Sequence, residues 1–166
     1  MIAALVVALL VAIGAAIWGW VDRPSAASAS AEASPAAALT AAQQVAVDLT
    51  TFDYRKLDES WARLEAESTP SFMDSLAANK SDVEAFDKRM KVISSGTVTA
   101  SAALPPAADG RVTVLLFVDQ RLYSLGSTTG EIQPARIQLV MTQAQGAWLA
   151  DEVTVTNLGP QAQAAH

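Results

Sequence analysis

The chain has no cysteine, and its only histidine is the last residue, His166. The lack of cysteine excludes a disulfide framework, a thiolate zinc site, a cysteine nucleophile and a lipoprotein-type lipid attachment site. A terminal histidine lies outside the expected core, so no Ser-His-Asp triad is expected. The sequence also lacks a Gly-rich phosphate loop and a calcium-binding loop motif. We therefore expect no metal ion, no cofactor and no catalytic residues.

Basic residues are also scarce, with eleven Lys and Arg against seventeen Asp and Glu and a net charge of −6. This acidity argues against nucleic-acid binding and against a patch that binds anionic lipids. Without the apolar N-terminal segment and the C-terminal tail, about 120 residues remain, which is enough for one domain.

Residues 2–21 form an apolar run without a charged side chain. A helix of this length is about 30 Å long, the thickness of a bilayer's hydrocarbon core. We predict a transmembrane helix over residues 1–21, single-pass in the cytoplasmic membrane, with its orientation poorly marked by flanking charge. A cleaved signal peptide is the alternative, because the Ala-Ser-Ala sequence near Ala27 could be cut. The run is longer than most signals, and no basic residue precedes it.

The remaining sequence divides by composition. Residues 22–34 are rich in Pro, Ala and Ser and predict a flexible linker. Residues 35–158 carry the periodic patterns of a folded domain, and residues 159–166 are expected to be a disordered tail.

Two N-cap signatures, Ser34-Pro35 and Thr69-Pro70, predict the starts of a first and a third helix. A short second helix is expected to start near Asp58. The third helix is expected to end at Gly96. Its predicted core-facing stripe consists of Phe72, Leu76, Val83, Phe86, Met90 and Ile93. Its acidic residues Asp82, Glu84 and Asp87 are expected on a solvated face.

After Gly96 the period changes from that of a helix to that of a strand. Four antiparallel strands are predicted, over Thr97–Leu104, Arg111–Ser124, Ile137–Gln143 and Trp148–Thr156. Runs of helices followed by runs of strands are typical of an α+β fold. We expect three helices packed on one face of a curved four-stranded sheet.

Three stretches of this domain resemble the Mce-associated membrane proteins of actinobacteria: LTTFDYRKLD at residues 49–58, GTV at 96–98 leading into VLLFVDQ at 114–120, and RIQLVM at 136–141 followed by GAWLADEV at 146–153. The resemblance covers roughly residues 40–156, together with the single N-terminal span. It implies an NTF2-like domain, a cone of helices on a bent sheet, outside the cytoplasmic membrane. It also implies proteins of an Mce-type lipid or sterol import complex as partners, and a lipid as a possible ligand.

Asp53 and Tyr54 are the first weak candidates for a ligand-binding site, because NTF2-like folds can use an acid and a tyrosine in a conical pocket. Adjacent helix residues point about 100° apart, so the favoured interpretation is structural: Tyr54 packs, and Asp53 and Arg55 stabilise the helix junction. Asp119 and Arg136 are the second weak candidates. A cross-strand ion pair is favoured over a pocket acid.

The sequence thus favours a non-enzymatic accessory protein that acts by protein–protein contacts in an Mce-type import system. One alternative is a lipid- or sterol-binding module, which an open apolar cavity would favour. A less favoured alternative is an enzyme of the isomerase or dehydratase type, which needs a buried acid facing that cavity.

Overall fold

The structure is a computed structural model that describes residues 34–157 of the 166-residue chain. The predicted transmembrane helix, almost all of the linker and the tail lie outside these residues. Within 34–157, no helix is both long and apolar enough to cross a membrane. The helices are α3 (Pro35–Thr50), α4 (Leu57–Ala66) and α5 (Pro70–Met90), and the strands are β1 (Phe52–Asp53), β2 (Ile93–Ala103), β3 (Val112–Ser124), β4 (Ser127–Ala144) and β5 (Ala147–Asn157).

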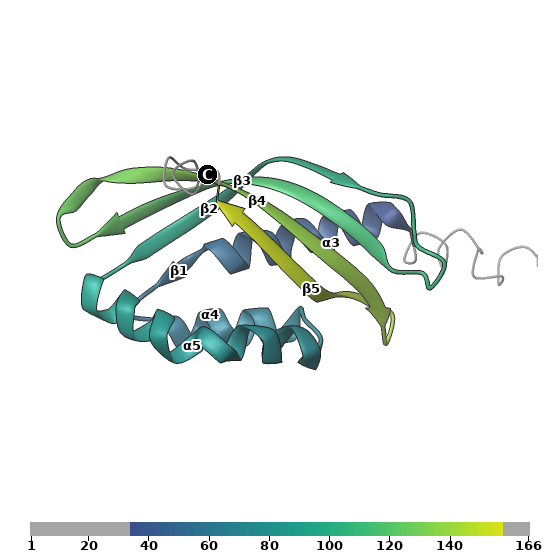
Figure 1. Ribbon diagram of the computed structural model, residues 1–166, viewed down its shortest axis with the longest axis horizontal. Helices are drawn as coiled ribbons and strands as arrows, with labels where there is room; N and C mark the ends of the chain where they lie inside the picture. Colours follow the sequence, from purple (N-terminus) through teal and green to yellow (C-terminus); the bar gives the residue numbers. More distant parts are fainter. Residues whose placement is uncertain (1–33, 158–166) are drawn as a thin grey trace, which may run out of the picture. The chain divides into compact units, whose positions relative to one another are not determined.

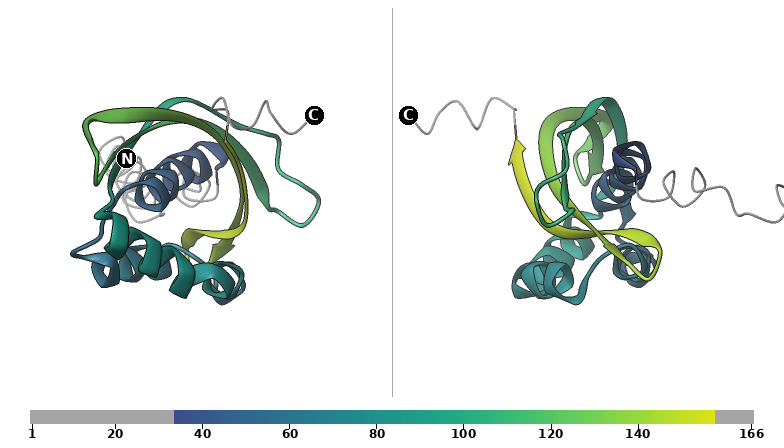
Figure 2. Two further views of the ribbon diagram at one scale, coloured as in Figure 1. Left: turned by 60° about the vertical axis from the view of Figure 1, so that its left-hand side comes forward. Right: turned by 90° about the vertical axis from the view of Figure 1, so that its right-hand side faces the viewer.

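The five strands form one antiparallel sheet in the order β1-β2-β3-β4-β5. The sheet curls around α3, while α4 and α5 lie at the open side of the curl (Figures 1 and 2). This arrangement confirms the prediction of an α+β fold with its helices on one face of a curved antiparallel sheet.

Both predicted N-caps are confirmed. The Ser34 side chain accepts a hydrogen bond from the backbone N–H of Ala37 at 3.2 Å, and Pro35 occupies the first helical position of α3. The Thr69 hydroxyl accepts from the N–H of Phe72 at 3.3 Å and starts α5 in the same way. A side-chain oxygen at this position satisfies an N–H that has no partner within the helix.

The core lies between α3 and the concave face of the sheet. Small residues of α3 allow its backbone to lie close to the strands, and Phe72 from the start of α5 is fully buried beside them. Besides Phe72, the buried members are Ala38, Ala42, Val45 and Ala46 of α3, Val112, Val114, Leu116 and Val118 of β3, Ile137, Leu139 and Met141 of β4, and Ala150 of β5. Alternation along β3 and β4 places these residues on a single face, as the period of two requires.

The predicted end of the third helix at Gly96 is wrong. Helix α5 ends at Met90, because Lys91 adopts a left-handed conformation (φ 51°) and donates its N–H to the carbonyl of Asp87. The chain then enters β2, so Ile93 and Gly96 pair with β3 instead of extending the helix. A left-handed residue after the last turn is a common way to end a helix.

The sequence predicts four strands, whereas the structure has five, and β2 and β4 begin earlier than predicted. A short fifth strand, β1, pairs Phe52 with Ser94 and Asp53 with Ile93. Strand β4 begins at Ser127, ten residues before the predicted start, and this added part pairs with the C-terminal half of β3. The start of β4 was missed because residues 127–136 are largely polar and lack a strict alternation.

Gly96 is the point where α3 and β2 come closest. A Cβ atom at Gly96 would lie 1.8 Å from Thr50 Oγ1 and 2.8 Å from Thr50 Cβ. The contact is reinforced on both sides: the Gly96 N–H donates to Thr51 Oγ1 at 3.0 Å, and Ser94 Oγ donates to the Thr50 carbonyl at 2.7 Å. Only glycine therefore fits at this crossing without a backbone shift.

We predict that Gly96→Ala lowers the free energy of unfolding by about 1–3 kcal/mol, because the added methyl group overpacks the α3–β2 crossing. Urea unfolding of the full chain, followed by tryptophan fluorescence, measures the change. The control is Ser95→Ala at the exposed neighbouring position, where a change within about 0.5 kcal/mol is expected. Equal stability of the two variants would contradict the close packing of α3 on β2.

Candidate functional site

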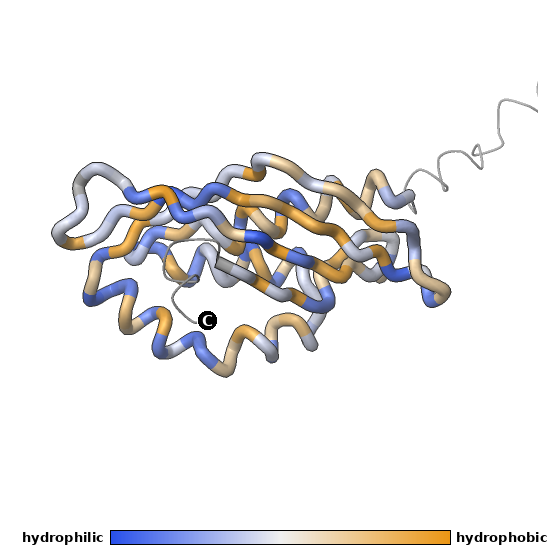
Figure 3. The backbone as a smooth tube through the Cα atoms, turned by 45° about the horizontal axis from the view of Figure 1, so that its top comes forward, coloured by the Kyte–Doolittle hydropathy of each residue, from blue (hydrophilic) through white to orange (hydrophobic). Residues whose placement is uncertain are grey.

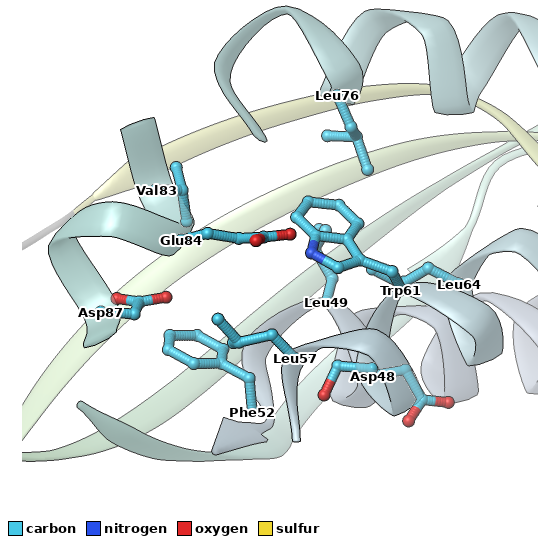
Figure 4. A pocket seen from close by; sticks show the side chains of 11 residues that line it. Asp48, Leu49, Phe52, Leu57, Trp61, Leu64, Leu76, Val83, Glu84 and Asp87 are labelled. Atoms are coloured by element: carbon cyan, nitrogen blue, oxygen red, sulfur yellow. The ribbon is translucent and has the colours of Figure 1, made fainter. Parts of the chain in front are cut away.

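An apolar cavity of about 170 Å³ lies between the C-terminal end of α3, helix α4 and helix α5 (Figure 4). Its walls are mostly hydrophobic, and four polar side chains interrupt them. The apolar lining residues are Leu49, Phe52, Leu57, Trp61, Leu64, Leu76 and Val83, and the polar ones are Asp48, Ser60, Glu84 and Asp87. The cavity lies at the helical side of the molecule, outside the packed core between α3 and the sheet.

Helix α5 turns a different face inward from the one predicted. Phe72 is buried in the core as expected, but Val83 is 45% exposed and Phe86 is 49% exposed, while Asp87 is only 4% exposed. Apolar and polar residues are interspersed along α5 up to its C-terminal end (Figure 3). The predicted core stripe is therefore wrong for Val83 and Phe86, because α3 already covers the concave face that this half of α5 would need.

Asp87 is the most unusual group of the cavity. Its carboxylate accepts no hydrogen bond and forms no ion pair with any residue of the described range 34–157, although the side chain is almost fully buried. Burial, and secondarily the negative charge of Glu84, raises the pKa of Asp87 above its ordinary value. The prediction of a solvated face is wrong for this residue.

The neighbouring Glu84 is engaged by two lysines of the same helix. Its carboxylate lies 3.1 Å from Lys88 Nζ and 3.9 Å from Lys80 Nζ. Lys80 also lies 4.9 Å from the centre of the Trp61 ring on α4. This cation–π contact connects α4 and α5 beside the cavity.

A second acidic cluster joins α3 to the end of α4. Asp48 accepts hydrogen bonds from Gln44 Nε2 at 2.8 Å and from Arg63 Nε at 2.9 Å. Burial, then the charge and hydrogen bonding of Asp48, raises the pKa of Glu67 to about 7, although Arg63 opposes the shift. Glu67 Oε2 is buried without a hydrogen-bond partner. Sequence reasoning missed this pair because Asp48 lies in α3 and Glu67 directly follows α4, with no diagnostic spacing between them.

The first predicted candidates lie outside the apolar cavity. Arg55 Nε donates to the two carboxylate oxygens of Asp53 at 2.9 and 3.0 Å, and the Arg55 N–H donates to Asp53 Oδ1 at 3.0 Å. These hydrogen bonds lower the pKa of Asp53 to about 2. The Arg55 guanidinium lies 5.7 Å from the centre of the Tyr54 ring. Asp53, Tyr54 and Arg55 therefore form a local cluster at the α3–α4 junction, in agreement with the structural interpretation.

The expected ion pair between Asp119 and Arg136 does not form. The register places Asp119 opposite Pro134 and places Arg136 opposite Phe117, so the two charged residues are diagonal neighbours on the exposed face of the sheet. Within residues 34–157 neither side chain has an ion-pair partner. Neither residue lines the apolar cavity.

The arrangement offers little for acid–base catalysis. Asp87 is held in the cavity, but no tyrosine or histidine of the described residues lines it. A carboxylate needs a second group at the reacting atom, such as an oxyanion donor, to catalyse an isomerisation of the ketosteroid type. The cavity thus combines apolar walls with one carboxyl group, that of Asp87, which has no side-chain partner within residues 34–157.

Over residues 1–156 the chain matches the family described as "Uncharacterized protein Rv1363c/MT1408-like". It belongs to this family. No curated protein matches the chain in sequence.

Several solved structures are similar to the chain in fold. The periplasmic domain of DotI has a TM-score of 0.62 and 17% identity, covering 74% of this chain and 95% of that domain. CagV, a VirB8 homolog of the type IV secretion system of Helicobacter pylori, has a TM-score of 0.61 and 11% identity, and the match covers 75% of this chain and 99% of CagV. An IcmL-like type IV secretion system protein of Legionella pneumophila has a TM-score of 0.58 and 13% identity, and the match covers 74% of this chain and 91% of that protein. At these identities the likeness shows the fold alone, and it confirms a curled α+β domain of the NTF2-like type.

We predict that Glu67 makes the protein less stable as the pH rises from about 4.5 to about 7. Its folded-state pKa of about 7 lies above the ordinary value of 4.5, so the folded state holds a proton that the unfolded state has lost in this window. Glu67→Gln cannot ionise, and we expect a flatter pH dependence with higher stability than wild type above pH 7. Urea unfolding from about pH 5 to about pH 8 measures both slopes.

The control is Glu65→Gln, which removes an exposed carboxyl from the last turn of α4, two residues before Glu67. It should keep the wild-type slope. A wild-type slope in Glu67→Gln would show that the Asp48–Glu67 pair does not hold the proton.

Proposed function

We propose that this protein is a non-enzymatic, membrane-anchored component of a cell-envelope assembly and that it acts through protein–protein contacts. The observation that carries the proposal is the surface formed by α4 and α5, called here the α4–α5 face. It combines the apolar cavity with two exposed apolar side chains of α5, Val83 and Phe86. Exposed apolar groups beside a concave site are typical of surfaces that bind another protein.

The size of the cavity favours a side chain over a lipid as its occupant. Pockets that hold drug-sized ligands measure about 300–1,000 Å³. A cavity of about 150 Å³ in another protein holds a single benzene molecule. The volume of about 170 Å³ found here fits one large side chain and is too small for a sterol. Binding of a whole lipid or sterol, the alternative considered from the sequence, is therefore less well supported.

The enzymatic alternative has less support still. Asp53 is the candidate general base of the sequence analysis. It pairs with Arg55 and has a pKa of about 2, which makes it a weak base at neutral pH. Tyr54 lies at the helix junction and does not line the cavity that holds Asp87.

The fold supports a location outside the cytoplasmic membrane. DotI contributes a periplasmic domain of this fold, and CagV is a VirB8 homolog of a secretion system. For this chain, residues 2–21 would supply the membrane anchor. We propose an Mce-type lipid import complex as the assembly, because the stretches at residues 49–58, 114–120 and 136–153 resemble Mce-associated proteins.

The test is copurification of MCE-domain proteins, the lipid-moving components of Mce-type import complexes, with the full chain from membranes in mild detergent. Mass spectrometry quantifies the recovered protein. We expect Phe86→Ser to reduce the recovered MCE-domain protein about tenfold, because the change removes an exposed aromatic side chain from the face. The control is Leu125→Ser, at a 54% exposed position in the turn between β3 and β4. Equal recovery with both variants would contradict the proposal.

We predict that Asp53→Asn leaves lipid uptake close to the wild-type rate at matched protein level. The change keeps the shape and hydrogen-bonding reach of the side chain but removes any general base at neutral pH. Uptake of a labelled fatty acid or sterol by cells measures the effect. Near-total loss of uptake, with partner binding intact, would overturn the non-enzymatic assignment.

A further inference from the structure

The cavity contains a buried negative charge that nothing in the described residues neutralises. Asp87 is 4% exposed and projects from α5 towards the apolar walls (Figure 4). A buried charge is costly unless it is paired and hydrogen-bonded. Within residues 34–157, the fully enclosed side-chain atoms without a hydrogen-bond partner are Glu67 Oε2 and Ser68 Oγ, so the Asp87 oxygens remain accessible from the cavity. A cation that enters the cavity from outside would reach the Asp87 carboxylate and pair with it.

The other charges around the cavity do not fill this role. Three carboxylates line it and no basic residue does. Asp48 is bonded to Arg63, and Glu84 pairs with Lys88 and Lys80. Asp87 alone keeps its full capacity to accept hydrogen bonds, so the cavity is complementary to one positive charge.

The walls suit a cation carried on a hydrocarbon stem. Leu49, Leu57 and Trp61 supply apolar surface opposite the carboxylates of α5 (Figure 4). Lysine and arginine side chains bury their methylene groups along apolar surfaces while their charged ends find polar partners. The volume of about 170 Å³ admits one such side chain.

The rim of the cavity favours a protein over a free small amine. Val83 lies at the opening with 45% of its surface exposed, and Phe86, one turn away on α5, is 49% exposed. A small amine in the cavity would leave both in water, whereas a polypeptide seated on the α4–α5 face would cover them. We infer that the cavity receives a lysine or arginine side chain of a partner protein, with Asp87 as the group that binds the positive end. The inference rests on the proposed function and specifies the chemistry of the partner.

The first test uses the full chain in nanodiscs and three capped amino acids as probes: N-acetyl-lysine methylamide, N-acetyl-arginine methylamide and N-acetyl-norleucine methylamide. Norleucine has the stem of lysine without its charge. We expect saturable shifts of the Trp61 indole resonance with the lysine or the arginine probe, and binding of norleucine at least about tenfold weaker. Equal binding of lysine and norleucine would overturn the inference, and so would no binding of either basic probe.

The second test compares Asp87→Asn with Asp74→Asn, an exposed carboxyl on the same helix. Asp87→Asn should weaken binding of the basic probe about tenfold, whereas Asp74→Asn should bind as wild type does. Because Asp87→Asn removes an unpaired buried charge, the thermal unfolding temperature of this variant should be no lower than that of wild type. Wild-type affinity in Asp87→Asn would overturn the inference. If Asp87→Asn does not fold, the comparison of lysine with norleucine on the wild-type chain decides.

Failure of this inference can be separated from failure of the proposed function. Recovery of MCE-domain protein that is lost in Phe86→Ser but unchanged in Asp87→Asn would overturn the basic side chain and leave the proposed function standing. Binding of the lysine probe without any MCE-domain protein copurifying with wild type would overturn the Mce-type assembly of the proposed function and leave the basic side chain as the group that the cavity receives.

Discussion

The packing of α3 into the curl of the sheet is the constraint on which the rest of the structure depends. Alanines at positions 38, 42 and 46 allow the helix backbone to lie close to β2 and β3, and Gly96 leaves room for Thr50 where α3 crosses β2. This close approach fills the concave face, the place where an NTF2-like cone would hold a ligand. The concave face of the sheet is therefore occupied by α3, and the apolar cavity lies beside it, between α3, α4 and α5.

Helices α4 and α5 lie at the open side of the curled sheet, because α3 already covers its concave face. The N-terminal part of α5 reaches the core through Phe72, Met73 and Leu76, and its second half packs across the cavity from α4. Because that half lacks a sheet beneath it, apolar residues remain exposed on one side while Asp87 turns inward. The same constraint thus produces the cavity, its exposed rim and its unpaired charge. These three features support the proposed contact surface on α4 and α5.

The sequence predicted the elements that depend on local signals and missed those that depend on tertiary packing. N-caps at Ser34 and Thr69 are local, and both were correct. The end of α5 was not, because the spacing of Ile93 fits a helix stripe as well as a strand, and only pairing with β3 decides between them. Asp87 looked like a solvated residue in a charge run, since nothing in the sequence shows that α3 displaces this half of α5 from the sheet.

The most direct test of the account is site-specific photocrosslinking in living cells, with a photoreactive phenylalanine analogue at one of two positions. Phe86 lies on the α4–α5 face, and Phe117 is similarly exposed, at 45%, on the opposite, convex face of the sheet. The account predicts a crosslink to an MCE-domain protein from position 86 and none from position 117. A crosslink from position 117 alone would contradict it, because the sheet and not the α4–α5 face would then contact the partner.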